Sequence, residues 1–320
     1  MPTIALLGIG QTKCDDPEAI ALRCKSRYSY GSDNNRICKY VVVINRRPAL
    51  CDVLPCPIMA QLTFVRRLDI RDKAAGLTEP SGLALARPGR GYWTVSDDTR
   101  RILRLNADGQ VRSDKSFASP RKQLEGIAAD ASGDTLYACR ETPARILKFD
   151  VPSQTVTVSR KLSKMQHYAE TLKQAFDAAA GKGLEGITTR ASDGHILALK
   201  ESKPGILIEI SPCLTRIVAT TELTPQQGFR ARDPDGAVDF SGIAWDQTRD
   251  AAWIVSDRAR RIYLFDLHSN SVRDTVDLTY PVNGGHKRVK KPEGIAHDPV
   301  TDCLHIVSDR KARLYIFKIG

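Results

Sequence analysis

Short apolar runs separated by turn-forming residues follow one another along most of the chain. Residues 92–95 and 253–255 are examples, rich in Tyr, Trp, Ile and Val. Runs of this kind predict β-strands. They recur in groups, and each group opens with the same phrase, in which a glycine precedes an aliphatic residue. The phrase occurs five times, at Gly82, Gly126, Gly186, Gly242 and Gly294. A period of this length predicts a repeat architecture.

The spacing inside each repeat is constant. An acid stands fifteen residues after every motif glycine: Asp97, Glu141, Glu201, Asp257 and Asp309. An aliphatic residue follows five positions later and opens another apolar run. Complete repeats therefore supply four strands, whereas the last repeat ends after three, and residues 61–70 read as a further strand. We predict a five-bladed β-propeller of four-stranded antiparallel blades over residues 61–320, closed by that N-terminal strand.

Residues 1–60 do not share the repeat, and we predict an atypical extension there that could be disordered. No basic residue precedes its first apolar run, as a secretory signal would require. Five of the eight cysteines fall in this segment, at spacings that match no common zinc pattern. No apolar run in the chain is long enough for a spanning helix.

The distances between motif glycines vary, at 44, 60, 56 and 52 residues. The extra length lies between the fourth strand of one blade and the first strand of the next, so the insertions share one face. The insertion at 163–181 reads as a helix with a capping box at Ser163 and Gln166, either a lid or a packing element. The insertion at 224–238 carries Arg230 and Arg232. The third, at 279–290, reads as a glycine-containing loop with a basic run.

The residue before each motif glycine is either Glu or Ser, and where it is Ser an acid stands two positions earlier. The five acids defined in this way are Glu79, Glu125, Glu185, Asp239 and Glu293. Each opens an innermost strand, so they are expected near the mouth of a central channel. Clustered carboxylates repel one another and bind cations, and hard oxygen ligands favour calcium. The alternative is that these acids only cap backbone amides at the strand entries. For the acids at the ends of second strands, we expect hydrogen bonds to the following amides or pairing with Arg261 or Arg313.

The charge of +11 comes from Lys and Arg spread along the chain, with one dense run at residues 286–291. This distribution favours a solvated basic surface over a nucleic-acid partner. The sequence contains no nucleophile elbow, phosphate-binding loop or His-Glu-x-x-His motif. His297 follows the fifth motif and His286 lies in the third insertion, so either could serve as a base beside a metal. His195 and His305 lie in second-strand patterns and are expected as packed or surface residues.

The Glu-Gly-Ile-Ala phrase at residues 293–296 and the Ser-Asp-Arg-Ala-Arg-Arg-Ile-Tyr stretch at residues 256–263 resemble the SdiA-regulated family of bacterial propellers, distantly related to NHL-repeat proteins. The resemblance covers about residues 61–320. It implies a five-bladed propeller with a calcium site and an extracytoplasmic location, although the N-terminal segment departs from the usual signal or anchor.

Two functional hypotheses remain open. In the first, a calcium-binding propeller binds a ligand or protein partner on the face with the 163–181, 224–238 and 279–290 insertions. In the second, calcium polarises an ester, lactone or phosphoester for hydrolysis. Arg230, Arg232 or Lys287 would attract an anionic small molecule in either case.

Overall fold

The chain forms two units, Met1–Met59 and Ala60–Gly320, in a computed structural model that describes residues 27–30, 36–44, 47–51, 61–87, 90–178, 182–233 and 236–320. The first unit contains a three-stranded antiparallel sheet in the order β1 (Arg27–Tyr30), β2 (Arg36–Ile44) and β3 (Arg47–Cys51). The prediction of disorder for residues 1–60 otherwise falls outside the described residues.

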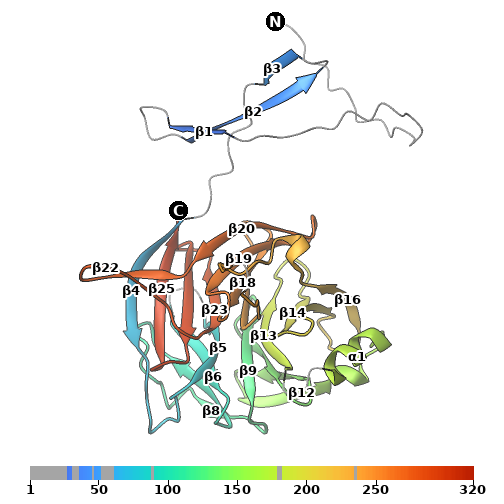
Figure 1. The fold of residues 1–320 in the computed structure, drawn as a ribbon. Helices are drawn as coiled ribbons and strands as arrows, with labels where there is room; N and C mark the ends of the chain where they lie inside the picture. The colour runs from blue at the N-terminus through green and yellow to red at the C-terminus, as the bar shows by residue number, and fades with distance from the viewer. Residues whose placement is uncertain are drawn as a thin grey trace, which may run out of the picture. The chain divides into compact units, whose positions relative to one another are not determined.

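The second unit consists of five four-stranded antiparallel sheets (Figure 1). Blade 1 contains β5 (Pro80–Leu85), β6 (Tyr92–Ser96), β7 (Arg101–Leu105) and β8 (Phe117–Ala118). Blade 2 contains β9 (Leu124–Ala129), β10 (Thr135–Arg140), β11 (Arg145–Asp150) and β12 (Thr155–Lys161). Blade 3 contains β13 (Leu184–Thr189), β14 (Ile196–Lys200), β15 (Ile206–Ile210) and β16 (Ile217–Glu222). Blade 4 contains β17 (Gly242–Asp246), β18 (Ala251–Ser256), β19 (Arg261–Asp266) and β20 (Ser271–Asp277).

Blade 5 combines both ends of the propeller unit. Its strands are β23 (Pro292–Asp298), β24 (Cys303–Ser308) and β25 (Arg313–Ile319), followed in space by β4 (Leu62–Asp69). β4 pairs with β25 in antiparallel register, with Leu68 opposite Leu314. The predicted five-bladed propeller and its closure by an N-terminal strand are therefore confirmed. Pairing with β4 satisfies the edge of β25 that an open array would leave free.

The five innermost strands touch one another in a closed ring, and the motif glycines lie where they touch. A Cβ atom added to Gly82 would lie 2.8 Å from both the Glu125 carbonyl oxygen and the Ile127 nitrogen of the next blade. A Cβ atom on Gly242 would approach the Glu293 carbonyl oxygen still more closely. Five blades make a narrow ring, so only glycine allows the backbones this proximity. This packing explains why the glycine recurs in every repeat.

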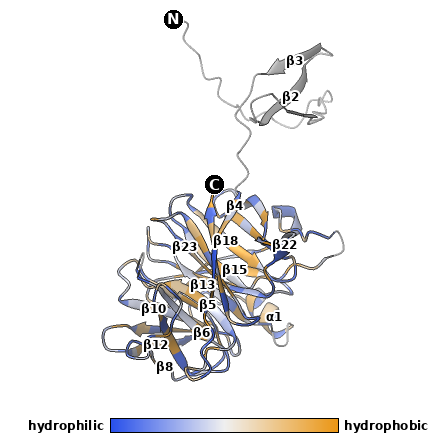
Figure 2. Cartoon of the chain, turned by 90° about the vertical axis from the view of Figure 1, so that its left-hand side faces the viewer, coloured by the Kyte–Doolittle hydropathy of each residue, from blue (hydrophilic) through white to orange (hydrophobic). Residues whose placement is uncertain are grey.

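The hydrophobic core lies between neighbouring blades. Trp253, Tyr263, Phe149 and Phe317 are among its largest fully buried side chains. Most of the hydrophobic stretches lie in the strands (Figure 2). The apolar runs found in the sequence therefore form the contacts between sheets that are stacked face to face.

The first insertion is helical over a shorter range than predicted. A 3₁₀ turn at Leu162–Lys164 precedes α1 (Glu170–Asp177), and Ala169 rather than Ser163 stands at the N-cap position, without a side-chain cap. The expected start was wrong because Gln166 pairs in parallel with Arg216 beside β16, extending blade 3 instead of starting a helix. Leu172 and Ala175 of α1 pack into the core of blades 2 and 3. The helix therefore packs against the blade edges.

The other two insertions are also ordered by local contacts. A 3₁₀ turn at Pro225–Gln227 has a capping box from Thr224 and Gln227, and Phe229 enters an aromatic cluster with Phe240, Tyr263 and Phe265. The third insertion, expected as a loop, is a hairpin of β21 (Thr279–Val282) and β22 (Gly285–Arg288). Gly284 in its two-residue turn has φ +82°, a conformation that favours glycine.

Candidate functional site

The residue before the motif glycine occupies a β-bulge in four of the five blades. The register between first and second strands shifts at Ser81, at Glu125, at Glu185 and at the Glu293–Gly294 step. A bulge inserts an extra residue and turns its side chain away from the regular alternation. The bulge therefore accounts for the special position of these side chains at the start of the innermost strands.

Ten carboxylates at equivalent positions of the five blades lie at this end of the ring, which we call the acidic mouth. Five open the innermost strands (Glu79, Glu125, Glu185, Asp239 and Glu293) and five follow the second strands (Asp97, Glu141, Glu201, Asp257 and Asp309). First and second strands are antiparallel, so the start of one lies beside the end of the other. Two lysines pair with members of the mouth: Lys182 with Glu201 and Lys291 with Asp309, each at 2.7 Å. The ten acids of the mouth therefore greatly outnumber the two lysines that pair with them.

The three bulged glutamates have strongly raised pKa values. Burial is the largest cause for each of them. For Glu125, burial and the nearby Asp97 and Glu141 raise the pKa to about 8. For Glu185, burial and the charges of Glu125 and Glu201 raise it to about 10. Burial and the charges of Asp257 and Asp309 raise the pKa of Glu293 to about 8. These perturbations link the acids of neighbouring blades into one electrostatic system.

Two sets of three acids have oxygens close enough to share one ion. Glu141, Glu185 and Glu201 each offer an oxygen within 4.8 Å of the others, and so do Glu79, Asp97 and Asp98. Carboxylate oxygens are the hard ligands that calcium prefers. Glu185 joins its set from the ring centre, flanked by acids of blades 2 and 3.

The structure separates the five acids that the sequence grouped together. Glu125, Glu185 and Glu293 occupy equivalent bulges, whereas Glu79 is exposed beside Asp97 and Asp98. Asp239 is buried and accepts hydrogen bonds from the Ser256 hydroxyl at 2.7 Å and the Arg258 amide at 2.9 Å. Asp239 therefore caps a backbone amide, as the alternative to metal binding predicts. Whether any of the five binds a metal stays a prediction.

The acids after the second strands play a larger part in the mouth than the sequence suggested. The prediction that Arg261 or Arg313 pairs with these acids is wrong. Arg261 pairs with Asp277, and Asp309 pairs with Lys291. Glu141 and Glu201 instead turn toward Glu185. Their constant distance from the motif glycine, combined with antiparallel pairing, was a sufficient signal to place them at the same mouth.

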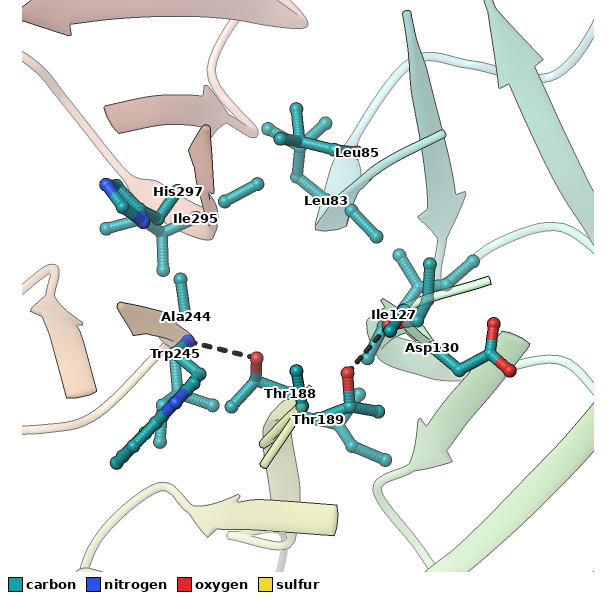
Figure 3. Close-up of a pocket in the computed structure, with 18 of the residues that line it drawn as sticks. Leu83, Leu85, Ile127, Asp130, Thr188, Thr189, Ala244, Trp245, Ile295 and His297 are labelled. Carbon is teal, nitrogen blue, oxygen red and sulfur yellow. Dashed lines mark hydrogen bonds between the residues drawn. The ribbon is translucent and has the colours of Figure 1, made fainter. Parts of the chain in front are cut away.

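A cavity of about 330 Å³ lies at the other end of the ring, lined by all five innermost strands. Aliphatic side chains such as Leu83, Ile127 and Ile295 surround it, and His297 reaches its wall (Figure 3). The Thr189 hydroxyl donates to the Ala129 carbonyl at 2.7 Å, joining the innermost strands of blades 2 and 3. His297 is four residues beyond Glu293, about 13 Å along a strand. It is therefore remote from the acidic mouth.

Each insertion forms one wall of a pocket next to its blade. The α1 insertion lines a cavity of about 410 Å³ with Tyr168 and Phe176, and this cavity reaches Glu141 and Lys182 of the mouth. The second insertion lines a cavity of about 500 Å³, and the β21–β22 hairpin lines one of about 380 Å³. Arg230 lies in the second pocket, and Arg232 there pairs with Asp277. The insertions thus form pockets on this face of the propeller instead of covering it.

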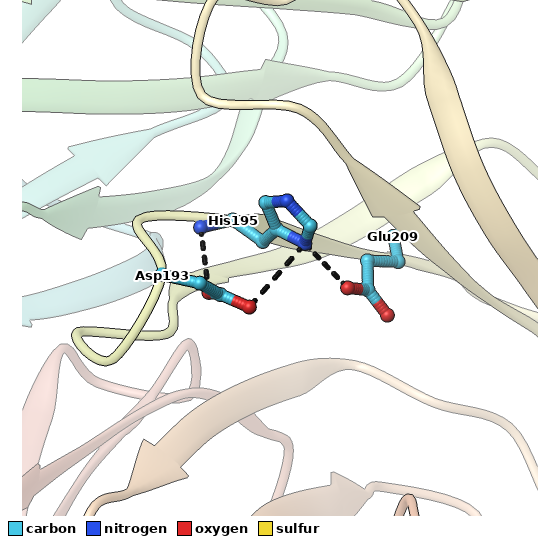
Figure 4. Close-up of side chains that lie close together, drawn as sticks. All are labelled: Asp193, His195 and Glu209. Atoms are coloured by element: carbon cyan, nitrogen blue, oxygen red, sulfur yellow. Dashed lines mark hydrogen bonds and ion pairs between the residues drawn. The ribbon is translucent and has the colours of Figure 1, made fainter.

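A second cluster of possible metal ligands lies on blade 3. His195 Nδ1 lies 2.5 Å from a Glu209 oxygen and 3.5 Å from an Asp193 oxygen (Figure 4). Arg190 forms ion pairs with both acids. The guanidinium already neutralises these carboxylates, so the cluster is an ion-pair network that ties the β13–β14 turn to β15. His195 and His305 were expected as packed or surface residues: His305 is buried against Tyr92, and the His195 side chain is partly exposed in this ion-pair network.

Comparison with known proteins agrees with this architecture. The sequence model of the SdiA-regulated family matches residues 59–318, which include every blade. The chain belongs to the SdiA-regulated family. No curated protein matches its sequence. In the part of this family member that the structure describes, no helix is long and apolar enough to cross a membrane.

Solved structures similar to this SdiA-regulated protein are distant in sequence. The glutaminyl cyclase of Myxococcus xanthus is 13% identical, with 81% of this chain and 96% of that chain covered and a TM-score of 0.54. The Cps50 (Swd1) β-propeller domain of Myceliophteria thermophila is 10% identical, with 81% and 100% covered and a TM-score of 0.46. The nidogen/laminin complex gives 13% identity, 88% and 94% coverage and a TM-score of 0.44. The first of these likenesses concerns the fold alone.

Proposed function

We propose that this propeller is a calcium-dependent binding module. Calcium would be held at the acidic mouth by Glu185 with Glu141 and Glu201, and supported by Glu125 and Glu293. The observation that carries the proposal is the convergence of carboxylates from every blade on one end of the ring, where Glu141, Glu185 and Glu201 each offer an oxygen to a common point. Mutual repulsion of buried acids destabilises the fold, and a bound cation removes that cost.

The ligand would bind on the same face, beside the ion. The pocket under α1 supports this assignment because it contains both aromatic side chains and a residue of the proposed calcium site, Glu141. A ligand in this pocket would contact Tyr168 and Phe176 while an oxygen of the ligand completed the coordination of calcium. Its volume of about 410 Å³ lies in the range of small-molecule sites.

The hydrolase hypothesis receives less support from the geometry. A hydrolytic reaction needs a base within hydrogen-bond reach of the attacking water. The histidines once considered for that part lie elsewhere: His297 lines the opposite cavity and His286 lies in the exposed β21–β22 hairpin. The binding module therefore remains the function that the site supports best.

Calcium-dependent melting tests the proposal. At calcium concentrations about a hundred times the dissociation constant, binding adds about 2.7 kcal/mol, which raises the melting temperature of a domain of this size by roughly 5–10 °C. Glu185→Gln and Glu141→Gln should weaken calcium binding at least tenfold by calorimetry. Glu222→Gln, at an exposed acid on β16, is the matched control and should bind like the wild type. An unchanged melting temperature in wild type with calcium and with chelator would refute the calcium site.

A further inference from the structure

A second site of opposite charge lies on blade 5. The β21–β22 hairpin and the turn between β24 and β25 enclose the cavity of about 380 Å³. Six cationic residues line it: Lys287, Arg288, Lys290, Arg310, Lys311 and Arg313. The remaining lining residues are Tyr280, Ser308 and Tyr315, so no carboxylate faces the cavity. We call it the basic pocket.

The cations of the basic pocket lack carboxylate partners. None of the six forms an ion pair with an acid in the part of the chain that the structure describes. Asp309, which precedes Arg310 in the sequence, is already paired with Lys291 at 2.7 Å. By contrast, the half-buried Arg261 and Arg249 of blade 4 each have an acid partner. Six like charges around one concavity repel one another, and a bound anion would relieve that repulsion.

The pocket is also built on a firm base. The Tyr280 and Tyr315 rings pack with centroids 5.2 Å apart, and Phe64 of β4 packs on Tyr280 at 5.9 Å. The Ser308 hydroxyl donates to the Lys290 carbonyl, which joins the hairpin to the end of β24. These contacts fix the two walls relative to each other. The cations are therefore held around a preformed cavity rather than on independent loops.

The charge, size and walls of the cavity together define the ligand. Arginine offers a planar fork of donors to phosphate oxygens, and lysine adds compact positive charge. A terminal phosphate carries about −1.5 to −2 at pH 7, so one phosphate balances only a small part of the charge of six cations, and two or more linked phosphates balance more of it. We propose that the basic pocket binds a small molecule with two or more linked phosphate groups.

Larger polyanions fit the pocket less well. The rings of Tyr280 and Tyr315 are 8% and 3% exposed, so they cannot serve as stacking platforms for the bases of a single-stranded nucleic acid. Insertion into a membrane surface needs exposed apolar side chains. The exposed large hydrophobic residues of the described chain are Val65, Val218 and Val300, none of which lines the pocket. The concave shape thus favours a small soluble anion.

Calorimetric titration with pyrophosphate and tripolyphosphate tests the proposal on the full chain. The protein is stripped of metal and dialysed free of chelator, so failure here would not bear on the calcium site. The pocket variant combines Lys287→Gln, Lys290→Gln and Lys311→Gln, all at exposed side chains. The control combines Lys122→Gln, Lys161→Gln and Lys164→Gln, which remove the same charge from exposed positions outside the described cavities.

We expect tripolyphosphate to bind the wild type at about 150 mM salt and orthophosphate to bind at least tenfold more weakly. The pocket variant should lose at least tenfold in affinity, about 1.4 kcal/mol, while the control stays within about twofold. Lys287→Gln alone, should the triple variant melt early, is expected to weaken binding about threefold. Equal loss in pocket variant and control would overturn the proposal. So would binding of duplex DNA or phosphatidylserine vesicles without binding of tripolyphosphate.

Discussion

At the scale of single residues, the repeated phrase combines a steric requirement with an electrostatic one. The glycine is constant because a Cβ atom at Gly82 or Gly126 would collide with the backbone of the next innermost strand. The residue before it varies because its bulged side chain leaves the strand alternation and faces the mouth of the ring. Adjacent positions of one motif thus answer to different constraints, packing in one case and charge in the other.

Gly82→Ala should destabilise the propeller by about 2–3 kcal/mol. The added methyl group would lie 2.8 Å from two backbone atoms of blade 2, and backbone cannot move aside as a flexible side chain can. Gly320→Ala is the control, because its nearest neighbouring atom lies 3.5 Å away. Urea denaturation of both variants gives the comparison. Equal stability of Gly82→Ala and wild type would contradict the steric account of the motif.

The sequence predicted where the candidate site lies better than it predicted which residues belong to it. Periodicity located Glu125, Glu185 and Glu293 at one end of the ring, because a repeat constrains where each copy lies. It could not show that Asp239 is committed to the Ser256 hydroxyl, since that contact depends on local loop geometry. It also predicted that Glu141 and Glu201 accept hydrogen bonds from the following backbone amides, because acids often do so in a turn after a strand.

At the scale of elements, closure of the ring depends on a strand from the far end of the propeller sequence. The fold was predictable because the last repeat lacks one strand and residues 61–70 supply one. The insertions were less predictable, since their structure depends on tertiary contacts. Gln166 pairs beside β16 instead of starting a helix, and Phe229 enters the core of blade 4. Local patterns cannot reveal contacts of this kind.

Removal of β4 should open the propeller. We expect a chain of residues 59–320 to unfold cooperatively, because Ala60–Gly320 is a compact unit. A chain of residues 71–320 should melt at least 10 °C lower or aggregate, since β25 would become an exposed edge and Phe64 would no longer cover Phe317. Circular dichroism melting and light scattering measure both outcomes. Similar melting of the two chains would show that closure by β4 is dispensable.

Neighbouring blades are also joined by charged side chains in their turns. Arg249 of blade 4 donates to Asp302 of blade 5 through two hydrogen bonds of 2.8 and 2.9 Å. His297 lies 3.1 Å from the same carboxylate. The hydrogen bonds from Arg249 lower the pKa of Asp302 from 3.8 to about 2. The ionised form is therefore stabilised in the folded state.

Asp302→Asn should reduce stability by about 1–2 kcal/mol at pH 7, less than the full shift implies because a third of the carboxyl group is exposed. A lowered pKa contributes stability above the unfolded value and loses it as pH falls. The difference between variant and wild type should therefore shrink below about pH 4 and vanish near pH 2. Urea denaturation across this range measures it, with Asp233→Asn as an exposed control. A difference that is constant with pH would argue against an ionic contribution.

At the scale of the whole molecule, charge is sharply divided on one face. The protein has a net charge of +11, yet its acidic mouth carries ten carboxylates around the end of the ring. The basic pocket lies on blade 5, and the Lys291–Asp309 pair joins the two regions. If both proposed sites bind their ions, such a surface suits a ligand that carries phosphate or carboxylate groups. Composition alone could not show this division, because the opposite charges cancel in the total.

Calcium binding at the acidic mouth should strengthen as pH rises. With pKa values raised to about 8 for Glu125 and Glu293 and about 10 for Glu185, these carboxyls hold protons at neutral pH in the metal-free protein. Raised pKa values for acids mean that the metal-free fold loses stability as pH increases from about 4.5 through about 8 for Glu125 and Glu293, and through about 10 for Glu185. Calcium requires the ionised form and must displace those protons.

The apparent affinity for calcium should therefore be at least tenfold higher at about pH 8.5 than at about pH 6, with proton release on binding. Calorimetry in two buffers of different ionisation enthalpy measures both quantities. Glu185→Gln removes the most perturbed carboxyl, so this variant should release fewer protons and melt at a higher temperature than the wild type without calcium. Glu222→Gln should behave as the wild type does. Calcium binding that is independent of pH would mean that the ion lies away from these glutamates, because ligands with such raised pKa values cannot bind it without losing protons.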